Sequence, residues 1–283
     1  MALLEMVYTS RLMNRDVQLR IIAPEGPAPE NGWPVLYLLH GGGDDHTSWT
    51  RRSNIERYVE KRNLVVVMPD GGGGQMSFYM DRVHGGKYFT LIADELPRLL
   101  SNMLHVSTRR EDTFIAGFSM GGYGAARFAL MRPEQYGGAI IMSAGNMIDH
   151  LDVGPMLMLE IPEVLRMMQD SFGDDFPYQK GTDSDLIYLA QKILDEGKPA
   201  PKLFQTIGTE DPGYEQTRSM REFFTNLSPD PFCYRFTEHP GTHNWDFWDL
   251  YICEGLDYMG LTEQEAAADA WTLMNKDGVD NTR

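Results

Sequence analysis

The sequence of 283 residues predicts an α/β fold, with a mostly parallel central sheet and helices on both of its faces. Two unbroken apolar runs of strand length, residues 34–40 and 63–69, are typical of strands buried on both faces of a parallel sheet. Strand-like and helical patterns alternate along most of the chain, as parallel strands joined by crossover helices require. The composition, 42% hydrophobic and 23% charged, is that of an ordinary globular protein and excludes a disordered or fibrous chain.

The first half of the chain contains the opening hairpin and most of the predicted sheet. Residues 3–10 and 16–22 predict two antiparallel strands, separated by Asn14 and Arg15. The elements that follow are, in order, strand 34–40, helix 54–61, strand 63–69, helix 88–104, strand 112–116, helix 121–131 and strand 136–142.

The alternation pauses at residues 147–199, where prolines and glycines interrupt two helical patterns. We interpret this stretch as a helical cap inserted between two strands. The alternation resumes with strand 202–207, helix 214–226, strand 232–237 and helix 245–258. We therefore expect one domain over residues 1–260 that carries the cap, followed by a short helix and a frayed tail at residues 261–283.

The charge balance excludes several classes of partner. The chain has 25 Lys and Arg residues and 41 Asp and Glu residues, which gives a net charge of −16. Such a chain repels phosphate backbones and anionic lipid surfaces, so we expect neither a nucleic-acid nor a membrane partner. No apolar stretch approaches the roughly 20 residues of a spanning helix, and the first residues lack a signal peptide, which favours a cytoplasmic protein. Cys233 and Cys253 are expected to be free thiols, and a homodimer is left open.

The strongest chemical signal is a serine placed between a predicted strand and a predicted helix. Gly117 to Gly121 form a G-x-S-x-G sequence around Ser119, directly after strand 112–116. A serine presented on such a strained turn needs small neighbours, and the following helix directs its free N–H groups toward an oxyanion. This pattern predicts a nucleophile for acyl transfer.

A serine nucleophile needs a base, and His243 is the favoured histidine. It precedes the last predicted helix, in a loop that can overhang the carboxyl edge of the sheet. His239 is the alternative, at the exit of strand 232–237. Pro240 and Gly241 separate these two histidines and argue against the helix that a metal pair four residues apart would need, so no metal is expected.

The acid that orients the base is expected on the turn after strand 202–207. Asp211 is the favoured residue and Glu210 its competitor. For the oxyanion we expect one N–H donor from Met120, the residue after the nucleophile. The second donor is expected from the glycines that follow His40, with Gly42 favoured over Gly41.

Two further groups of residues lie near these predicted loops. The four glycines at residues 71–74 predict a flexible loop rather than a phosphate cradle, because no G-x-x-x-x-G-K-[ST] sequence is present. Trp49, Tyr79 and Trp245 are candidates to line a substrate pocket, although each is equally compatible with the core.

Together these motifs resemble the esterase D-like branch of the α/β hydrolases. The resemblance covers about residues 1–260 and rests on five segments, residues 40–43, 67–70, 117–124, 208–211 and 241–248. It implies the α/β-hydrolase fold, with Ser119 as nucleophile, Asp211 as orienting acid and His243 as base. Many relatives carry a larger residue where this chain has Gly42.

The residues and the resemblance predict a serine carboxylesterase that acts on a small-molecule ester without a cofactor. Acetyl-type short acyl groups, or feruloyl groups on plant-derived sugars, are the expected substrates. An acyltransferase, or a thioesterase similar to S-formylglutathione hydrolase, would use the same three residues. A noncatalytic binding protein is the alternative from another class.

Overall fold

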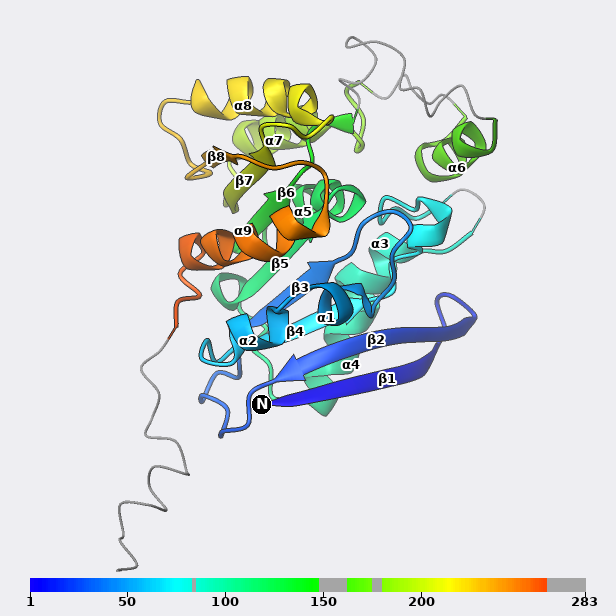
Figure 1. The fold of residues 1–283 in the computed structure, drawn as a ribbon, viewed down its shortest axis with the longest axis vertical. Coiled ribbons are helices and arrows are strands. Elements are labelled where there is room, and N and C mark those ends of the chain that lie inside the picture. Colours follow the sequence, from blue (N-terminus) through cyan, green and yellow to red (C-terminus); the bar gives the residue numbers. More distant parts are fainter. Residues whose placement is uncertain (83–84, 148–161, 175–179, 264–283) are drawn as a thin grey trace, which may run out of the picture.

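A sheet of eight strands runs through the structure, a computed structural model that describes residues 1–82, 85–147, 162–174 and 180–263 (Figure 1). Its spatial order is β1-β2-β4-β3-β5-β6-β7-β8. The strands are β1 (Ala2–Ser10), β2 (Arg15–Ala23), β3 (Val35–Leu39), β4 (Val65–Pro69), β5 (Thr113–Phe118), β6 (Gly138–Met142), β7 (Lys202–Gly208) and β8 (Arg235–His239).

The sheet is mostly parallel, as the sequence predicts. β3 pairs in parallel with β4 and β5, and the parallel pairing continues through β6 and β7 to β8. The opening hairpin adds the antiparallel pairs β1 with β2 and β2 with β4. Because the carboxyl ends of parallel strands meet at one edge, the loops that follow β3, β5, β7 and β8 gather there.

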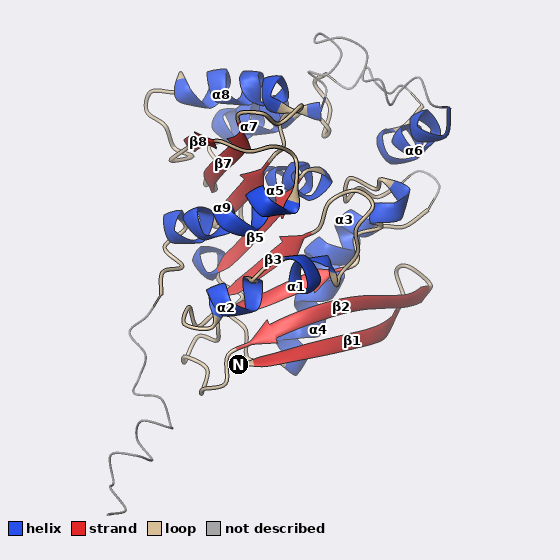
Figure 2. Cartoon of the chain, viewed as in Figure 1, coloured by secondary structure: helices blue, strands red, loops and turns tan. Residues whose placement is uncertain are grey.

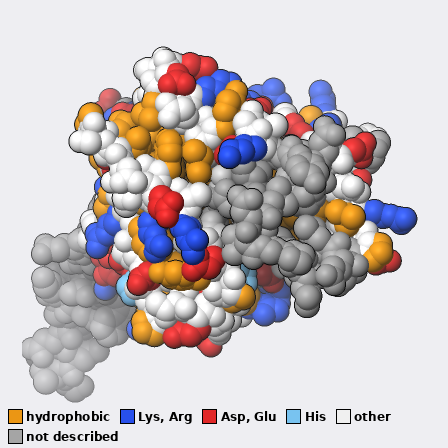
Figure 3. Space-filling model, turned by 90° about the horizontal axis from the view of Figure 1, so that it is seen from above, with side chains coloured by type: hydrophobic (Ala, Val, Ile, Leu, Met, Phe, Trp, Pro, Cys, Tyr) orange, Lys and Arg blue, Asp and Glu red, His pale blue; other side chains and the backbone are white. Residues whose placement is uncertain are grey.

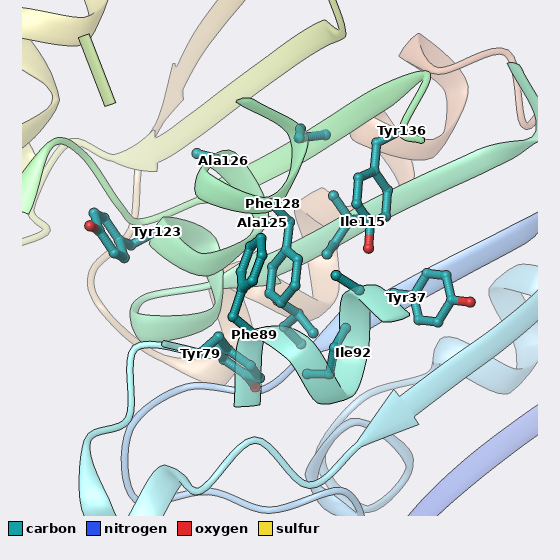
Figure 4. Packing of buried hydrophobic residues seen from close by; sticks show 14 of the residues in the cluster. Tyr37, Tyr79, Phe89, Ile92, Ile115, Tyr123, Ala125, Ala126, Phe128 and Tyr136 are labelled. Atoms are coloured by element: carbon teal, nitrogen blue, oxygen red, sulfur yellow. The ribbon is translucent and has the colours of Figure 1, made fainter. Parts of the chain in front are cut away.

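Helices cover both faces of the sheet (Figure 2). One face carries α1 (Ser48–Arg52), α2 (Ile55–Val59) and α9 (Trp245–Tyr258), which pack in one hydrophobic cluster. The other face carries α3 (Tyr88–Thr90), α4 (Leu96–Met103), α5 (Met120–Met131), α7 (Leu186–Glu196) and α8 (Arg218–Thr225). A π-helical turn, Leu91–Glu95, joins α3 to α4. Figure 4 shows the aromatic and aliphatic side chains of this second cluster.

The predicted cap is described only in part. α6 (Pro162–Phe172) lies apart from the sheet in Figure 1, while residues 148–161 and 175–179 fall outside the described residues. α7 packs on α5 and α8, and its side chains Leu189 and Ile193 join the main cluster. This helix therefore belongs to the layer that covers the sheet.

Several element boundaries differ from the predictions by a few residues, and β8 shows a physical reason. β8 begins at Arg235 rather than at residue 232, because the Asp230 carboxylate accepts hydrogen bonds from the N–H groups of Phe232 and Tyr234 and holds them in a loop. The short helix α1 was not predicted. The short helix and tail expected at residues 261–283 fall almost entirely in residues 264–283, outside the described part.

Basic and acidic side chains are interspersed on the face seen from above (Figure 3). Among the helices of the described residues, none has the length and apolarity needed to cross a membrane. Cys233 is exposed and Cys253 half-buried, and both are free thiols.

Candidate active site

Ser119 lies at the sharp turn between β5 and α5, with a positive φ of 53° and ψ of −122°. Only tight local packing maintains such a conformation in a non-glycine residue. The neighbouring glycines allow that packing: a Cβ atom on Gly117 would lie 2.4 Å from the Gly121 carbonyl oxygen, and one on Gly121 would lie 2.5 Å from that of His40. The turn therefore presents the Ser119 hydroxyl as the sequence predicts.

His243, Asp211 and Ser119 form a continuous hydrogen-bonded chain. Nε2 of His243 lies 2.9 Å from Oγ of Ser119, and Nδ1 lies 2.9 Å and 3.1 Å from the two carboxylate oxygens of Asp211. Because a carboxylate can only accept, Nδ1 carries the proton and Nε2 is free to accept from the serine hydroxyl. This is the arrangement that a general base requires.

Burial and a further hydrogen bond fix the Asp211 carboxylate. Its side chain is fully buried, whereas that of His243 is 33% exposed. Oδ1 of Asp211 also accepts the N–H of Gly213 at 2.7 Å. The acid is thus held inside the protein, behind a base that is partly exposed.

The two alternative residues have other partners. The carboxylate of Glu210 accepts the backbone N–H of Gly241 and makes no contact with His243 among the described residues. His239 lies 2.8 Å from the Glu254 carboxylate and stacks on Tyr251. Neither residue can replace Asp211 or His243 in this geometry.

The loop after β3 faces the helix that begins at Met120. Among the described residues, the backbone N–H groups of Gly41, Gly42 and Met120 have no hydrogen-bond acceptor. Gly41 packs so closely on the Phe118 ring that a Cβ atom would lie 2.4 Å from it. Free N–H groups on both sides of Ser119 are what an oxyanion site needs.

His40 holds this loop from inside the protein. Its Nε2 accepts the Gly71 N–H at 2.9 Å, so the ring is neutral there and Nδ1–H donates to the Gly41 carbonyl at 2.9 Å. The prediction of a flexible loop at residues 71–74 is corrected: Gly71 and Gly73 are buried, and the Gly73 carbonyl accepts the N–H of Gly43 at 3.0 Å. The glycines allow this close backbone approach.

Two of the three aromatic residues predicted to line the substrate pocket lie in the core instead. Trp49 is 1% exposed and its Nε1–H donates to the Leu39 carbonyl, while Tyr79 is fully buried and its hydroxyl donates to the His40 carbonyl. Both side chains thus hold the backbone where β3 ends and the loop after it begins. Burial raises the pKa of Tyr79. Trp245 is half-buried, packs against Phe118 and remains a candidate.

Sequence reasoning missed Trp248, which contacts the base directly. Its ring is perpendicular to that of His243 at 5.1 Å and stacks on Phe118 at 3.9 Å. Its Nε1–H donates to the Ser143 hydroxyl at 3.0 Å, which fixes the indole. The signal was its position three residues after Trp245, on the same face of α9.

The arrangement is suited to acyl transfer. A hydroxyl, a base, a buried acid and free N–H donors converge at the carboxyl edge of the sheet, as nucleophilic attack on a carbonyl requires. Among the described residues, no group of three or more His, Cys, Asp or Glu side chains could hold a metal ion. That the reaction needs no metal or cofactor stays a prediction.

Comparison with known proteins places the chain in a family. The Esterase family matches residues 10–259. An acetyl esterase of Caldicellulosiruptor saccharolyticus is 26% identical over 268 residues, which cover 92% of this chain and 98% of the relative.

Two solved structures from Staphylococcus aureus are similar throughout. The fluorophosphonate-binding serine hydrolase FphF superposes with a TM-score of 0.79 and 29% identity, over 92% of this chain and 98% of that protein. The S-formylglutathione hydrolase FrmB gives a TM-score of 0.75 and 28% identity, over 92% and 99%. With the sheet order and the serine turn described above, these matches identify the chain: it belongs to the Esterase family and is a serine esterase with the α/β-hydrolase fold.

Proposed function

We propose that this esterase hydrolyses short-chain acyl esters, acetyl esters first, through an acyl-enzyme on Ser119. The observation that carries the proposal is the hydrogen-bonded chain from buried Asp211 through His243 to the Ser119 hydroxyl. The similarity to an acetyl esterase supports a small acyl group.

In the first half of the reaction, Ser119 Oγ attacks the ester carbonyl carbon while His243 Nε2 takes its proton. Asp211 stabilises the imidazolium that forms. The carbonyl oxygen becomes an oxyanion and is bound by the N–H of Met120 and by that of Gly42 or Gly41. The imidazolium then donates its proton to the departing alcohol oxygen, the bond between carbonyl carbon and alcohol breaks, and the acyl-enzyme remains.

In the second half, water replaces the alcohol. His243 Nε2 takes a proton from water as its oxygen attacks the acyl carbon, and the same N–H groups bind the second oxyanion. Collapse of this intermediate returns the proton to Ser119 Oγ and releases the carboxylic acid. An acceptor alcohol or thiol in place of water would make the same site an acyltransferase.

A thioesterase acting on S-formylglutathione is the second candidate. It is favoured by the similarity to the S-formylglutathione hydrolase FrmB over almost the whole chain. The same three residues would serve, because a thiolate leaves more easily than an alkoxide and needs no additional acid.

The test is hydrolysis of p-nitrophenyl esters from acetate to octanoate, a ferulate ester and S-formylglutathione, each by wild type and Ser119→Ala. We expect the highest kcat/KM on acetate or butyrate and a loss of about 10⁴-fold or more in the variant. Ser101→Ala, which removes an exposed hydroxyl on α4, is the matched control. S-formylglutathione as the best substrate would favour the second candidate, and no turnover of any ester would refute the proposal.

A further inference from the structure

Met76 lies against the loop that is proposed to bind the oxyanion. A Cβ atom on Gly42 would lie 2.6 Å from Sδ and 3.2 Å from Cε of Met76, and within 4 Å it would meet no other side chain or backbone among the described residues. The thioether therefore fills the space into which a side chain at position 42 would project. Met76 is half-buried, so part of this side chain faces outward.

The order of strands separates the two halves of an ester bound at Ser119. Ser119 follows β5, His243 follows β8 and Met76 follows β4, and β4 and β8 lie on opposite sides of β5 in the sheet. Because His243 must give a proton to the departing oxygen, the alcohol half lies toward β8. The acyl half, on the other side of the carbonyl carbon, then points toward β4 and Met76.

From this contact and this topology we propose that Met76 bounds the acyl site and sets the length of acyl group that the enzyme accepts. The inference rests on the proposed ester hydrolysis at Ser119. It adds a specificity-determining residue that the motifs of the sequence do not mark.

The backbone of Met76 is held in place relative to the oxyanion loop. It has a positive φ of 48°, its N–H donates to the Gly73 carbonyl at 3.1 Å, and that carbonyl also accepts the N–H of Gly43. The Met76 carbonyl accepts the Ser171 hydroxyl of α6 at 2.9 Å. The Gly73 carbonyl thus joins the loop after β3 to the segment that carries Met76. Helix α6 is bonded to the same segment through the Met76 carbonyl.

Further contacts attach the same segment to α6. Buried Arg82 donates to Gln75 Oε1 at 2.7 Å and to Asp170 Oδ2 of α6 at 2.9 Å. The rings of Phe78 and Phe172 pack at 5.0 Å. With the backbone fixed at both ends, shortening Met76 should open space rather than let the segment collapse. The flexible thioether is the part of this wall that can adapt to a ligand.

The experiment measures the ratio of kcat/KM on p-nitrophenyl octanoate to that on the acetate. Met76→Ala should raise this ratio by about tenfold or more, the size of effect that a few methylene groups have in an apolar site. The double variant Gly42→Leu with Met76→Ala returns bulk to the same space from the other loop and should bring the ratio back toward wild type. Met103→Ala, which shortens an exposed methionine on α4, should leave the ratio unchanged.

The outcomes separate this inference from the proposed function. If wild type is active and Met76→Ala keeps the wild-type ratio, Met76 does not bound the acyl site. A gain in kcat/KM of Met76→Ala that is confined to acetate esters of longer alcohols would likewise overturn the inference, because it would place Met76 beside the alcohol half of the ester. If wild type hydrolyses no ester, it is the proposed function that fails. Met76→Leu, of similar volume, gives a folded comparison should the alanine variant be unstable.

Discussion

Glu210 lies beside Asp211 and ties together the two loops that carry the acid and the base. Its carboxylate accepts the Gly241 N–H, its own N–H donates to the Gly241 carbonyl at 2.9 Å, and its carbonyl accepts the Thr242 hydroxyl. The bond from Gly241 lowers the pKa of the Glu210 carboxyl, so the carboxylate keeps this bond until the pH falls below the usual range for glutamate. We therefore expect Glu210 to act as a positioning residue, where the sequence offered it as a competitor for the acid.

Removing the Glu210 side chain should weaken catalysis more than binding. We expect Glu210→Ala to lower kcat on acetate by about tenfold with little change in KM, because misplacing His243 affects the transition state. Glu210→Gln keeps an acceptor for Gly241 and should recover most of the loss. Steady-state kinetics with Glu215→Ala, an exposed acid paired with Arg218, provides the control. Equal losses in the alanine and glutamine variants would contradict a role through this hydrogen bond.

At the level of single residues, the sequence predicted which polar side chains meet better than it predicted which aromatic side chains are buried. Ser119, Asp211 and His243 were expected to meet because each follows a predicted strand and the carboxyl ends of parallel strands lie at one edge, and the structure brings the three side chains together. Trp49 and Tyr79 were misplaced because local pattern does not show whether an aromatic side chain between two predicted strands turns inward or outward. Their direction depends on acceptors, the Leu39 and His40 carbonyls, that lie on another segment of the chain.

At the scale of elements, α5 shows a tertiary contact overriding helix propensity. Replacing a helical glycine with alanine normally stabilises a helix by about 1 kcal/mol. At Gly121 the added Cβ would lie 2.5 Å from the His40 carbonyl oxygen and 2.8 Å from that of Leu39. These backbone atoms lie at the end of β3 and at the start of the loop proposed to bind the oxyanion, so neither can move aside without disturbing that loop.

We therefore expect Gly121→Ala to destabilise the protein by about 1–3 kcal/mol and to reduce activity strongly. Thermal unfolding and hydrolysis of p-nitrophenyl acetate measure the two effects. Gly74→Ala is the control, because a Cβ atom there would meet nothing within 4 Å among the described residues. A Gly121→Ala enzyme with wild-type stability and activity would show that the turn tolerates this backbone shift.

Most helices and strands followed from local pattern, and the exceptions have identifiable causes. Runs that are apolar at every position, such as β3 and β4, predict buried strands because both faces are covered. The π-helical turn Leu91–Glu95 was not predicted, since apolar periodicity does not distinguish it from an α-helix. The glycines at residues 71–74 looked flexible because their neighbours, His40 and Asp44, are distant in sequence.

At the scale of the whole molecule, one sheet joins two hydrophobic clusters. The order of its strands could not be predicted from local pattern, because β3 lies between β4 and β5 although it precedes both in the chain. Successive residues of a strand point to opposite faces. Leu38 belongs to the cluster under α1, α2 and α9, and Leu39 belongs to the cluster under α5.

Because the two clusters share the sheet, we expect them to unfold together. Leu38 and Leu39 are fully buried on opposite faces of the sheet. Leu38→Ala and Leu39→Ala should each lower the free energy of unfolding by about 2–5 kcal/mol. For a chain of this length that corresponds to a fall in Tm of roughly 2–4 °C per kcal/mol, within a single transition. Calorimetry together with near-UV circular dichroism would detect this. A second transition in only one variant would show that the face carrying that leucine unfolds separately, and that the sheet does not couple the two layers.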